Sequence, residues 1–155
     1  MPSLVIYDSL YGNTEKIAKA VGQGLGGDVS VRRISDIGTV DWNTVPLLIV
    51  GAPTQGGRAT QAIQDLINNI PANGLKNSNV AAFDTRFLQK DQNFALRMLM
   101  KSIGYAADKI AKVLENKGGK LVAAPEGFIV TGKEGPLADG ELERATNWAK
   151  GLAST

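Results

Sequence analysis

The segment L-V-I-Y-D-S-L-Y-G-N-T-E-K-I-A-K-A-V, residues 4–21, decides the fold of this chain. It begins with four consecutive apolar residues, Leu4–Tyr7, and a continuous apolar run is typical of a strand covered on both faces. Its second half places Ile17 and Val21 four residues apart, as in a one-sided amphipathic helix. The loop Ser9–Thr14 between them is rich in hydroxyl, glycine and amide residues. A buried strand followed by such a loop and a helix predicts the first unit of a parallel α/β sheet.

The same alternation of strand and helix continues along the chain. Further strands are predicted at Val29–Ile34, Leu47–Val50 and Asn79–Phe83, with an interrupted strand or two short ones at Leu121–Ala124 and Phe128–Val130. Three more amphipathic helices are predicted from apolar stripes that begin at Ile63, Ile103 and Leu142. Residues 36–43, between the second and third strands, predict only a loop or a short helical turn. The order predicts a doubly wound parallel sheet with right-handed crossovers.

Length and composition limit the class of protein. The chain has 155 residues without a visible linker or repeat, so we expect one domain over residues 1–155. It contains no Cys and no His, which excludes disulfides, thiolate nucleophiles, Ser-His-Asp triads and the usual zinc sites, and no metal site is predicted. No apolar stretch approaches the roughly 18 residues of a membrane span, and the first residues do not resemble a signal peptide. We therefore expect a cytoplasmic protein whose redox chemistry, if any, belongs to a bound organic cofactor.

A G-x-G-x-x-G sequence occurs at Gly22, Gly24 and Gly27, but its position argues against dinucleotide binding. That motif works when it follows a strand and opens a helix, because the pyrophosphate then lies at the helix N-terminus. Here the glycines come at the end of a predicted helix and precede a strand, where glycine is typical of a helix end or turn.

Positive charge is concentrated in the second half of the chain. The net charge is +2 overall, and the span Arg86–Lys120 contains eight basic and three acidic residues, a net +5. Such a stretch is either a solvated helix face or a patch that attracts acidic partners. Arg97, Lys101 and Lys109 are candidate docking charges. Segment Leu88–Lys101 fits no simple pattern; it is a candidate for an extra short helix, and whether it covers a site or lies on the surface is left open.

The loop Ser9–Thr14 has the position expected of an anion site. In open α/β sheets, ligands bind beyond the carboxyl ends of the strands, next to the point where the strand order reverses. The loop also leads into a helix, whose first N–H groups and dipole favour an anion. Gly12 permits close approach of the backbone, and the loop contains no Lys or Arg. A turn that only caps the helix is the alternative.

The motifs are similar to those of the flavodoxin family. S-L-Y-G-N-T at Ser9–Thr14 resembles the family's phosphate loop, [ST]-x-T-G-N-T, with Tyr11 in place of the usual Thr. G-A-P-T-Q-G-G-R at Gly51–Arg58 resembles the first flavin-contacting loop, and F-D-T-R-F at Phe83–Phe87 occupies the place of the second. The ending, residues 125–145, also resembles flavodoxin-like domains, so the likeness extends over essentially the whole chain. The resemblance implies a five-stranded parallel sheet with strand order 2-1-3-4-5 and helices on both faces.

The resemblance also implies FMN as the cofactor. The implied phosphate-binding residues are Ser9, Leu10, Tyr11, Gly12, Asn13 and Thr14. The residues implied to line the isoalloxazine ring are Pro53, Thr54, Gln55, Gly56 and Gly57 on one side, and Asp84, Thr85, Arg86 and Phe87 on the other.

Several of these residues could tune the flavin. A glycine peptide can turn its carbonyl toward flavin N5, and Gly56 and Gly57 are the candidates. Gln55 stands where an aromatic residue is frequent, so Phe87 is the first candidate ring partner, before Trp42 and Tyr105. Arg86 is either a cation near the flavin or the partner of Asp84 in a structural ion pair.

The sequence leaves three functions open. The first is an FMN-binding electron carrier without a catalytic side chain, which takes one or two electrons from a reductase and passes them to another protein. Because the sequence pI is about 8.9, that acceptor is expected to be acidic. The second is an FMN-dependent NAD(P)H:quinone oxidoreductase, and the third is a domain that keeps the fold without flavin. Whether the chain is an enzyme with its own substrate is left open, although an electron carrier is favoured. Nucleic acid is not expected as a partner, and no membrane span is expected.

Overall fold

The computed structural model describes residues 2–88 and 104–153 of the chain. Its strands are β1 (Ser3–Tyr7), β2 (Val29–Arg33), β3 (Leu47–Pro53), β4 (Asn79–Phe87), β5 (Lys120–Leu121) and β6 (Glu126–Val130). Its α-helices are α1 (Asn13–Leu25), α2 (Gln61–Asn68), α4 (Ala106–Asn116) and α5 (Glu141–Ala153). Arg97, Lys101, Ile103 and all of segment Leu88–Lys101 except Leu88 lie outside the described residues.

All strand pairs that form the sheet are parallel, in the order β2-β1-β3-β4-β5, and β6 also pairs with β4. This confirms the predicted doubly wound sheet and strand order. The link between β2 and β3 contains two single-turn 3₁₀ segments, Ile34–Asp36 and Trp42–Thr44, as the weak pattern of residues 36–43 predicts. Among the described helices, none is long and apolar enough to cross a membrane.

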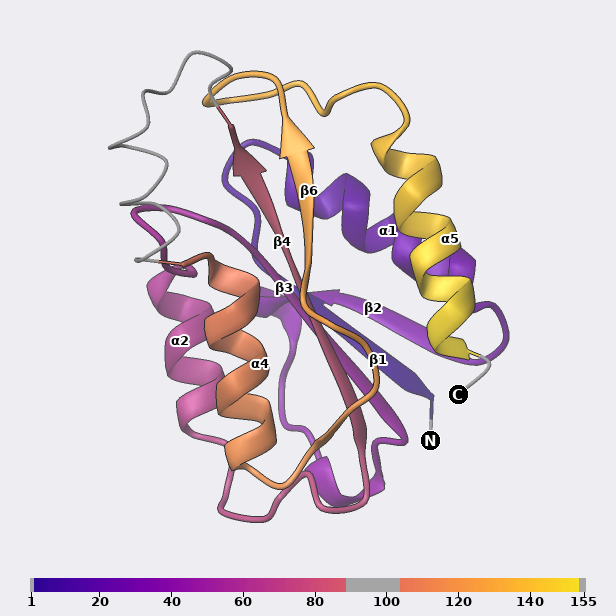
Figure 1. The fold of residues 1–155 in the computed structure, drawn as a ribbon. Helices are drawn as coiled ribbons and strands as arrows, with labels where there is room; N and C mark the ends of the chain where they lie inside the picture. The colour runs from indigo at the N-terminus through magenta and orange to yellow at the C-terminus, as the bar shows by residue number, and fades with distance from the viewer. Residues whose placement is uncertain (1, 89–103, 154–155) are drawn as a thin grey trace.

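The two faces of the sheet carry separate cores. Side chains alternate along a strand, so Leu4 and Ile6 of β1 join one core while Val5 and Tyr7 join the other. Helices α2 and α4 cover the first face, and α1 and α5 cover the second (Figure 1). Both faces are buried, which explains why the central strands are continuously apolar.

The fifth position of the sheet is shared by two short strands. Leu121 of β5 is the register partner of Val80, and Glu126 of β6 is the partner of Phe83. Between these pairs β4 has two residues, 81 and 82, whereas the opposite strand has four, 122–125, so two residues are in excess. The predicted interruption is therefore present, but its predicted position is wrong: β5 ends at Leu121 and β6 already begins at Glu126, so the break covers residues 122–125 rather than 125–127.

Gly24 has a packing role between helices rather than a role in a ligand loop. A Cβ atom at Gly24 would lie 2.2 Å from the carbonyl oxygen of Thr146 and 2.8 Å from the Cβ of Ala149, both in α5. Gly26 ends α1 with a φ of 61°. The glycines of the G-x-G-x-x-G sequence lie within or just after a helix, away from the carboxyl ends of the strands.

Arg144 joins α5 to the end of the sheet. Its guanidinium donates hydrogen bonds to Glu141 at 2.8 and 2.9 Å and to Glu126 at 2.6 Å, and its Cζ lies 4.4 Å from the centre of the Phe128 ring. Glu141 is buried and also accepts the backbone N–H of Ile129 at 2.7 Å. The carboxylate thus holds both the helix and β6.

We expect Glu141 to contribute to the acid sensitivity of the fold. Hydrogen bonding from Arg144 lowers the pKa of Glu141 below its usual value. A lowered folded-state pKa stabilises the fold fully above the unfolded-state pKa of about 4.3, and this stability disappears as pH falls through the folded-state pKa. Urea midpoints measured from pH 7 to pH 3 should therefore fall more in the wild type than in Glu141→Gln. The same loss in both proteins would contradict this assignment.

Candidate functional site

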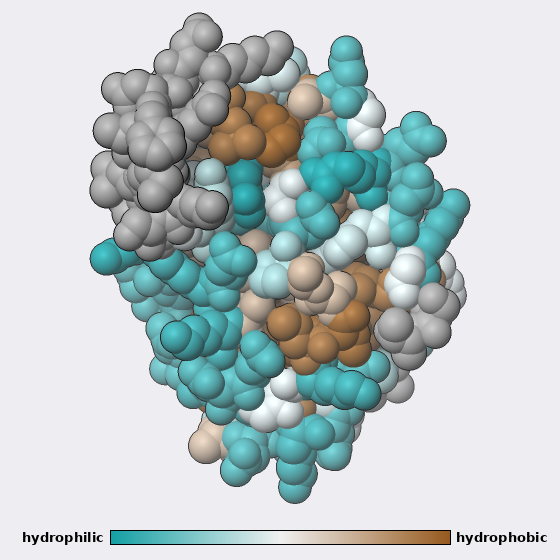
Figure 2. All heavy atoms as spheres, in the orientation of Figure 1, coloured by the Kyte–Doolittle hydropathy of each residue, from teal (hydrophilic) through white to brown (hydrophobic). Residues whose placement is uncertain are grey.

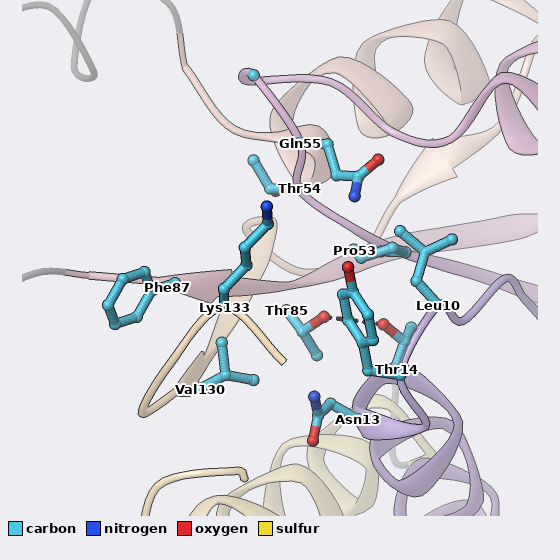
Figure 3. A pocket seen from close by; sticks show the side chains of 12 residues that line it. Leu10, Asn13, Thr14, Pro53, Thr54, Gln55, Thr85, Phe87, Val130 and Lys133 are labelled. Carbon is cyan, nitrogen blue, oxygen red and sulfur yellow. Dashed lines mark hydrogen bonds between the residues drawn. The ribbon is translucent and has the colours of Figure 1, made fainter. Parts of the chain in front are cut away.

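A cavity of about 270 Å³ lies at the carboxyl ends of β1, β3 and β4. The strand order reverses between β1 and β3, and this is where ligands bind in sheets of this class. Its lining comes from four segments, at the ends of β1, β3, β4 and β6 and just beyond them, and Figure 3 shows the side chains converging on one space. The lining residues are Leu10, Tyr11, Asn13, Thr14, Pro53, Thr54, Gln55, Gly56, Thr85, Phe87, Val130 and Lys133.

Ser9 organises the loop after β1. Its hydroxyl oxygen accepts the N–H of Gly12 at 3.1 Å and of Glu15 at 3.3 Å, and its own N–H donates to Asp8 at 2.9 Å. The hydroxyl oxygen is therefore occupied as an acceptor, which leaves its hydrogen as the group that can be donated to a ligand. Ser9 is buried and does not belong to the lining of the cavity, whereas the next residue, Leu10, does.

The same loop leaves backbone donors available. Gly12 is the N-cap of α1, with a φ of 92° that favours glycine. The N–H groups of Asn13 and Thr14 lie in the first turn of the helix, where no intrahelical acceptor exists. Within the described part of the chain, the N–H groups of Leu10 and Tyr11 make no hydrogen bond either. This set of uncharged donors suits an anion such as a phosphate.

Two hydroxyl groups meet at the bottom of the cavity. Thr14 Oγ1 and Thr85 Oγ1 lie 2.8 Å apart and share one hydrogen bond (Figure 3, dashed line). Two hydroxyls have two hydrogens, so one remains for a ligand whichever residue donates. The pair also ties the loop after β1 to the end of β4.

The loop after β3 forms a tight two-residue turn. The N–H of Gln55 donates to the carbonyl of Arg58 at 2.8 Å, and the N–H of Arg58 donates to that of Gln55 at 3.0 Å. Gly56 and Gly57 lie between them with φ values of 56° and 78°, both in the left-handed region. Two successive positive φ values require residues such as glycine, which explains the Gly-Gly pair. Gly56 lines the cavity, whereas Gly57 is buried and does not.

Asp84 and Arg86 form an ion pair beside the site. Arg86 donates to both carboxylate oxygens of Asp84 at 2.8 and 2.7 Å, and its Cζ lies 3.6 Å from the centre of the Tyr105 ring. Asp84 is fully buried and accepts the N–H of Ala107 at 2.9 Å, at the start of α4. The structure therefore shows the ion-pair alternative for Arg86, and Tyr105 contacts the guanidinium.

The segment after β6 adds a charged residue that the motifs do not indicate. The side-chain amide of Asn13 donates to the carbonyl of Glu134 at 3.0 Å, and a Cβ at Gly135 would lie 2.7 Å from that amide. This contact places Lys133 in the lining, with its side chain extending into the cavity toward Thr54 in Figure 3. Lys133 is the one charged residue among the lining residues that the structure describes.

The structure brings together most of the site residues expected from the sequence. Ten of them line the cavity: Leu10, Tyr11, Asn13, Thr14, Pro53, Thr54, Gln55, Gly56, Thr85 and Phe87. Five of them adjoin the lining without belonging to it: Ser9, Gly12, Gly57, Asp84 and Arg86. Trp42 packs against the core on the α2–α4 face. Val130 and Lys133 are additional lining residues.

Three exposed apolar side chains belong to the cavity lining, and a fourth, Leu88, follows one of them directly in the chain. Leu10, Tyr11, Phe87 and Leu88 are 38–48% exposed, unlike almost every other large apolar side chain in the described residues. Figure 2 shows hydrophobic side chains at the end of the molecule where β4 and β6 terminate. Such exposure is typical of a binding region.

Comparison with known proteins identifies the family. The model of the flavodoxin domain matches residues 4–133. Oxidised flavodoxin 1 from Bacillus cereus superposes with a TM-score of 0.72 at 17% identity, covering 99% of this chain and 98% of that one. A flavodoxin from the domain Archaea gives 0.74 at 20% identity, with coverage of 99% and 97%.

A flavodoxin, WrbA-like protein from Agrobacterium tumefaciens gives a TM-score of 0.72 at 15% identity, with coverage of 99% and 95%. At these identities the superpositions show the fold. No curated protein sequence matches the chain significantly.

Proposed function

Because this chain belongs to the flavodoxin domain family, whose proteins bind FMN, we propose that it is an FMN-binding electron-transfer protein. In this proposal it carries one or two electrons between a reductase and a second redox protein. The observation that carries the proposal is the convergence of four segments on one cavity, whose lining combines the donor-rich loop after β1 with Phe87, Thr54 and Gly56. A single domain over residues 1–155 and a cytoplasmic location belong to the same proposal.

The residues present fit FMN. The donors of the loop Ser9–Thr14 suit its phosphate, since the Ser9 hydroxyl hydrogen and several backbone N–H groups of the loop remain to be donated. The apolar rim of Leu10, Tyr11 and Phe87 suits a large planar ring that remains partly exposed. When bound, FMN supplies the redox chemistry, since it can exchange one or two electrons.

Residues at the ends of β3 and β4 would orient the ring. Pro53 to Gly56 would lie along one side, and the Gly56 peptide is the candidate to turn its carbonyl toward flavin N5, because it lines the cavity and Gly57 does not. Thr85 and Phe87 would lie along the other side. We propose that Asp84 and Arg86 support this end of β4 by their ion pair and by the hydrogen bond that Asp84 accepts from Ala107 in the first turn of α4.

Lys133 is the proposed cation near the ring. Reduced flavin gains negative charge, so a lysine that extends toward Thr54 should bind reduced FMN more tightly than oxidised FMN. We expect Lys133→Met to lower the preference for reduced over oxidised FMN about tenfold. For a one-electron step this lowers the reduction potential of the bound FMN by roughly 59 mV. Spectroelectrochemical titration would measure the shift, and Lys150→Met, a substitution of an exposed lysine in α5, is the control. Equal potentials in the Lys133 variant and the wild type would contradict this role.

The experiment that tests the function is titration of the apoprotein with FMN, followed by stepwise photoreduction. Tight binding at one site per chain and reversible uptake of electrons support the carrier. A protein that is colourless after incubation with FMN and removal of the unbound FMN overturns the proposed function.

The alternative is an FMN-dependent NAD(P)H:quinone oxidoreductase. Two observations favour it: the similarity of the fold to the WrbA-like protein and the exposed apolar residues of the cavity. Steady NAD(P)H oxidation with a quinone and without a reductase would favour this enzyme. Reduction only through a reductase, followed by transfer to a protein, would favour the carrier. Comparing acidic and basic acceptor proteins at rising salt tests the expectation of an acidic partner.

A further inference from the structure

We propose that Arg33 and Glu15, two charged residues outside the cavity, set the affinity of the site for the phosphate half of its ligand in opposite directions. The inference rests on the proposed FMN function. The motif loop itself contains no basic residue, so charge that acts on a bound phosphate has to come from its surroundings.

Arg33 reaches the loop from the neighbouring strand. It is the last residue of β2 and the register partner of Tyr7, the last residue of β1, so its side chain starts beside the point where the loop begins. One guanidinium nitrogen donates to the carbonyl oxygen of Ser9 at 2.5 Å, and the other lies 3.3 Å from Glu15 Oε1. Arg33 thus binds both the loop backbone and the first turn of α1.

The hydrogen bond from Arg33 to the Ser9 carbonyl affects the N–H of Leu10, which lies on the opposite side of the same peptide group. The carbonyl of Ser9 and the N–H of Leu10 belong to one planar peptide unit, in which C=O and N–H point in opposite directions. A cation that hydrogen-bonds the oxygen polarises the peptide and strengthens its N–H as a donor. This N–H makes no hydrogen bond in the described residues, and Leu10 lines the cavity.

Glu15 provides the opposing charge. Its carboxylate lies in the first turn of α1, accepts the Tyr7 hydroxyl at 3.0 Å, and pairs with Arg33 and, at 3.6 Å, with Lys19. The hydrogen bond from Tyr7 and the charge of Lys19 lower the pKa of Glu15, so it is ionised at neutral pH. A carboxylate this close to the phosphate loop repels a dianion, and Arg33 screens it.

The test compares FMN with unphosphorylated riboflavin, which shares the ring and lacks the phosphate. We expect Arg33→Met to weaken FMN binding about tenfold, the scale of one charge-assisted hydrogen bond, with riboflavin affinity changed less than about twofold. Glu15→Gln should strengthen FMN binding severalfold and leave riboflavin unchanged. The matched control is Arg32→Met, because Arg32 precedes Arg33 in the strand but bonds Ser30 and the carbonyl of Ile37.

The outcomes separate this inference from the function. Unchanged FMN affinity in Arg33→Met, or equal losses for FMN and riboflavin, overturns the role in phosphate affinity while the FMN function stands. Arg33→Lys keeps the positive charge and should retain part of the FMN affinity. Circular dichroism of each variant shows whether a loss of affinity comes from poor folding. Wild-type protein that binds no FMN overturns the proposed function and this inference together.

Discussion

Gly12→Asp should abolish FMN binding, with a loss of more than about 100-fold, while the chain stays folded. Gly12 is the N-cap of α1, and a Cβ placed there meets no atom within 4 Å, so a side chain fits. An aspartate at this position would direct its carboxylate to the free N–H groups of the first turn, which are the donors proposed for the phosphate. Isothermal titration with FMN measures the loss.

The matched control is Gly12→Asn. Asparagine has nearly the shape of aspartate and tolerates positive φ better than most residues, so it carries the same backbone strain without the charge. We expect it to bind FMN within about tenfold of the wild type. Equal affinities in the Asp and Asn variants would show that the phosphate does not lie at this helix N-terminus.

Gly51→Ala should destabilise the fold by about 3 kcal/mol, the upper end of typical overpacking costs. Gly51 in β3 is the register partner of Phe83 in β4, and the Phe83 ring lies over it. A Cβ at Gly51 would lie 2.0 Å from Phe83 Cζ. Phe83 is fully buried in edge-to-face contact with Phe128 and Trp148, at ring distances of 6.1 and 6.2 Å, so it has no free space to enter.

A double-mutant cycle isolates this contact. Phe83→Leu removes the ring atoms that the new methyl group meets, so Gly51→Ala should cost much less in the Phe83→Leu background than in the wild type. Urea denaturation of the four proteins gives the coupling energy. Additive losses would show that the strain at Gly51 has another source.

The fold could be predicted because its signals are local. Leu4–Tyr7 and Leu47–Val50 are apolar throughout, and the helices carry regular stripes, so each element is recognised from its own residues. The predicted end of the strand Asn79–Phe83 is wrong, since β4 continues to Phe87 through Asp84 and Arg86. Polar residues there read as a loop, but β6 pairs with residues 83–87 and the ion pair satisfies the buried carboxylate.

The site could be predicted only in part, because some of its contacts join distant segments. Lys133 enters the lining through a bond between Asn13 and Glu134, residues 121 positions apart, and no local pattern announces such a contact. In the sequence, Arg33 resembles any charged residue of an edge strand. Only the register of β1 and β2, which pairs Arg33 with Tyr7, places it beside the start of the loop. Arg86, in contrast, belongs to the predicted F-D-T-R-F motif, which the structure places at the end of β4, and its ion pair with Asp84 accounts for it.

The uneven fifth position of the sheet has a consequence for self-association. An exposed outer strand offers a row of unpaired N–H and C=O groups to which another chain can add. Here that row is divided into β5 and β6 by a four-residue bend that contains Pro125, which has no N–H to donate. The flank of the molecule that β5 and β6 form is thereby a poor template for pairing with the strand of another chain.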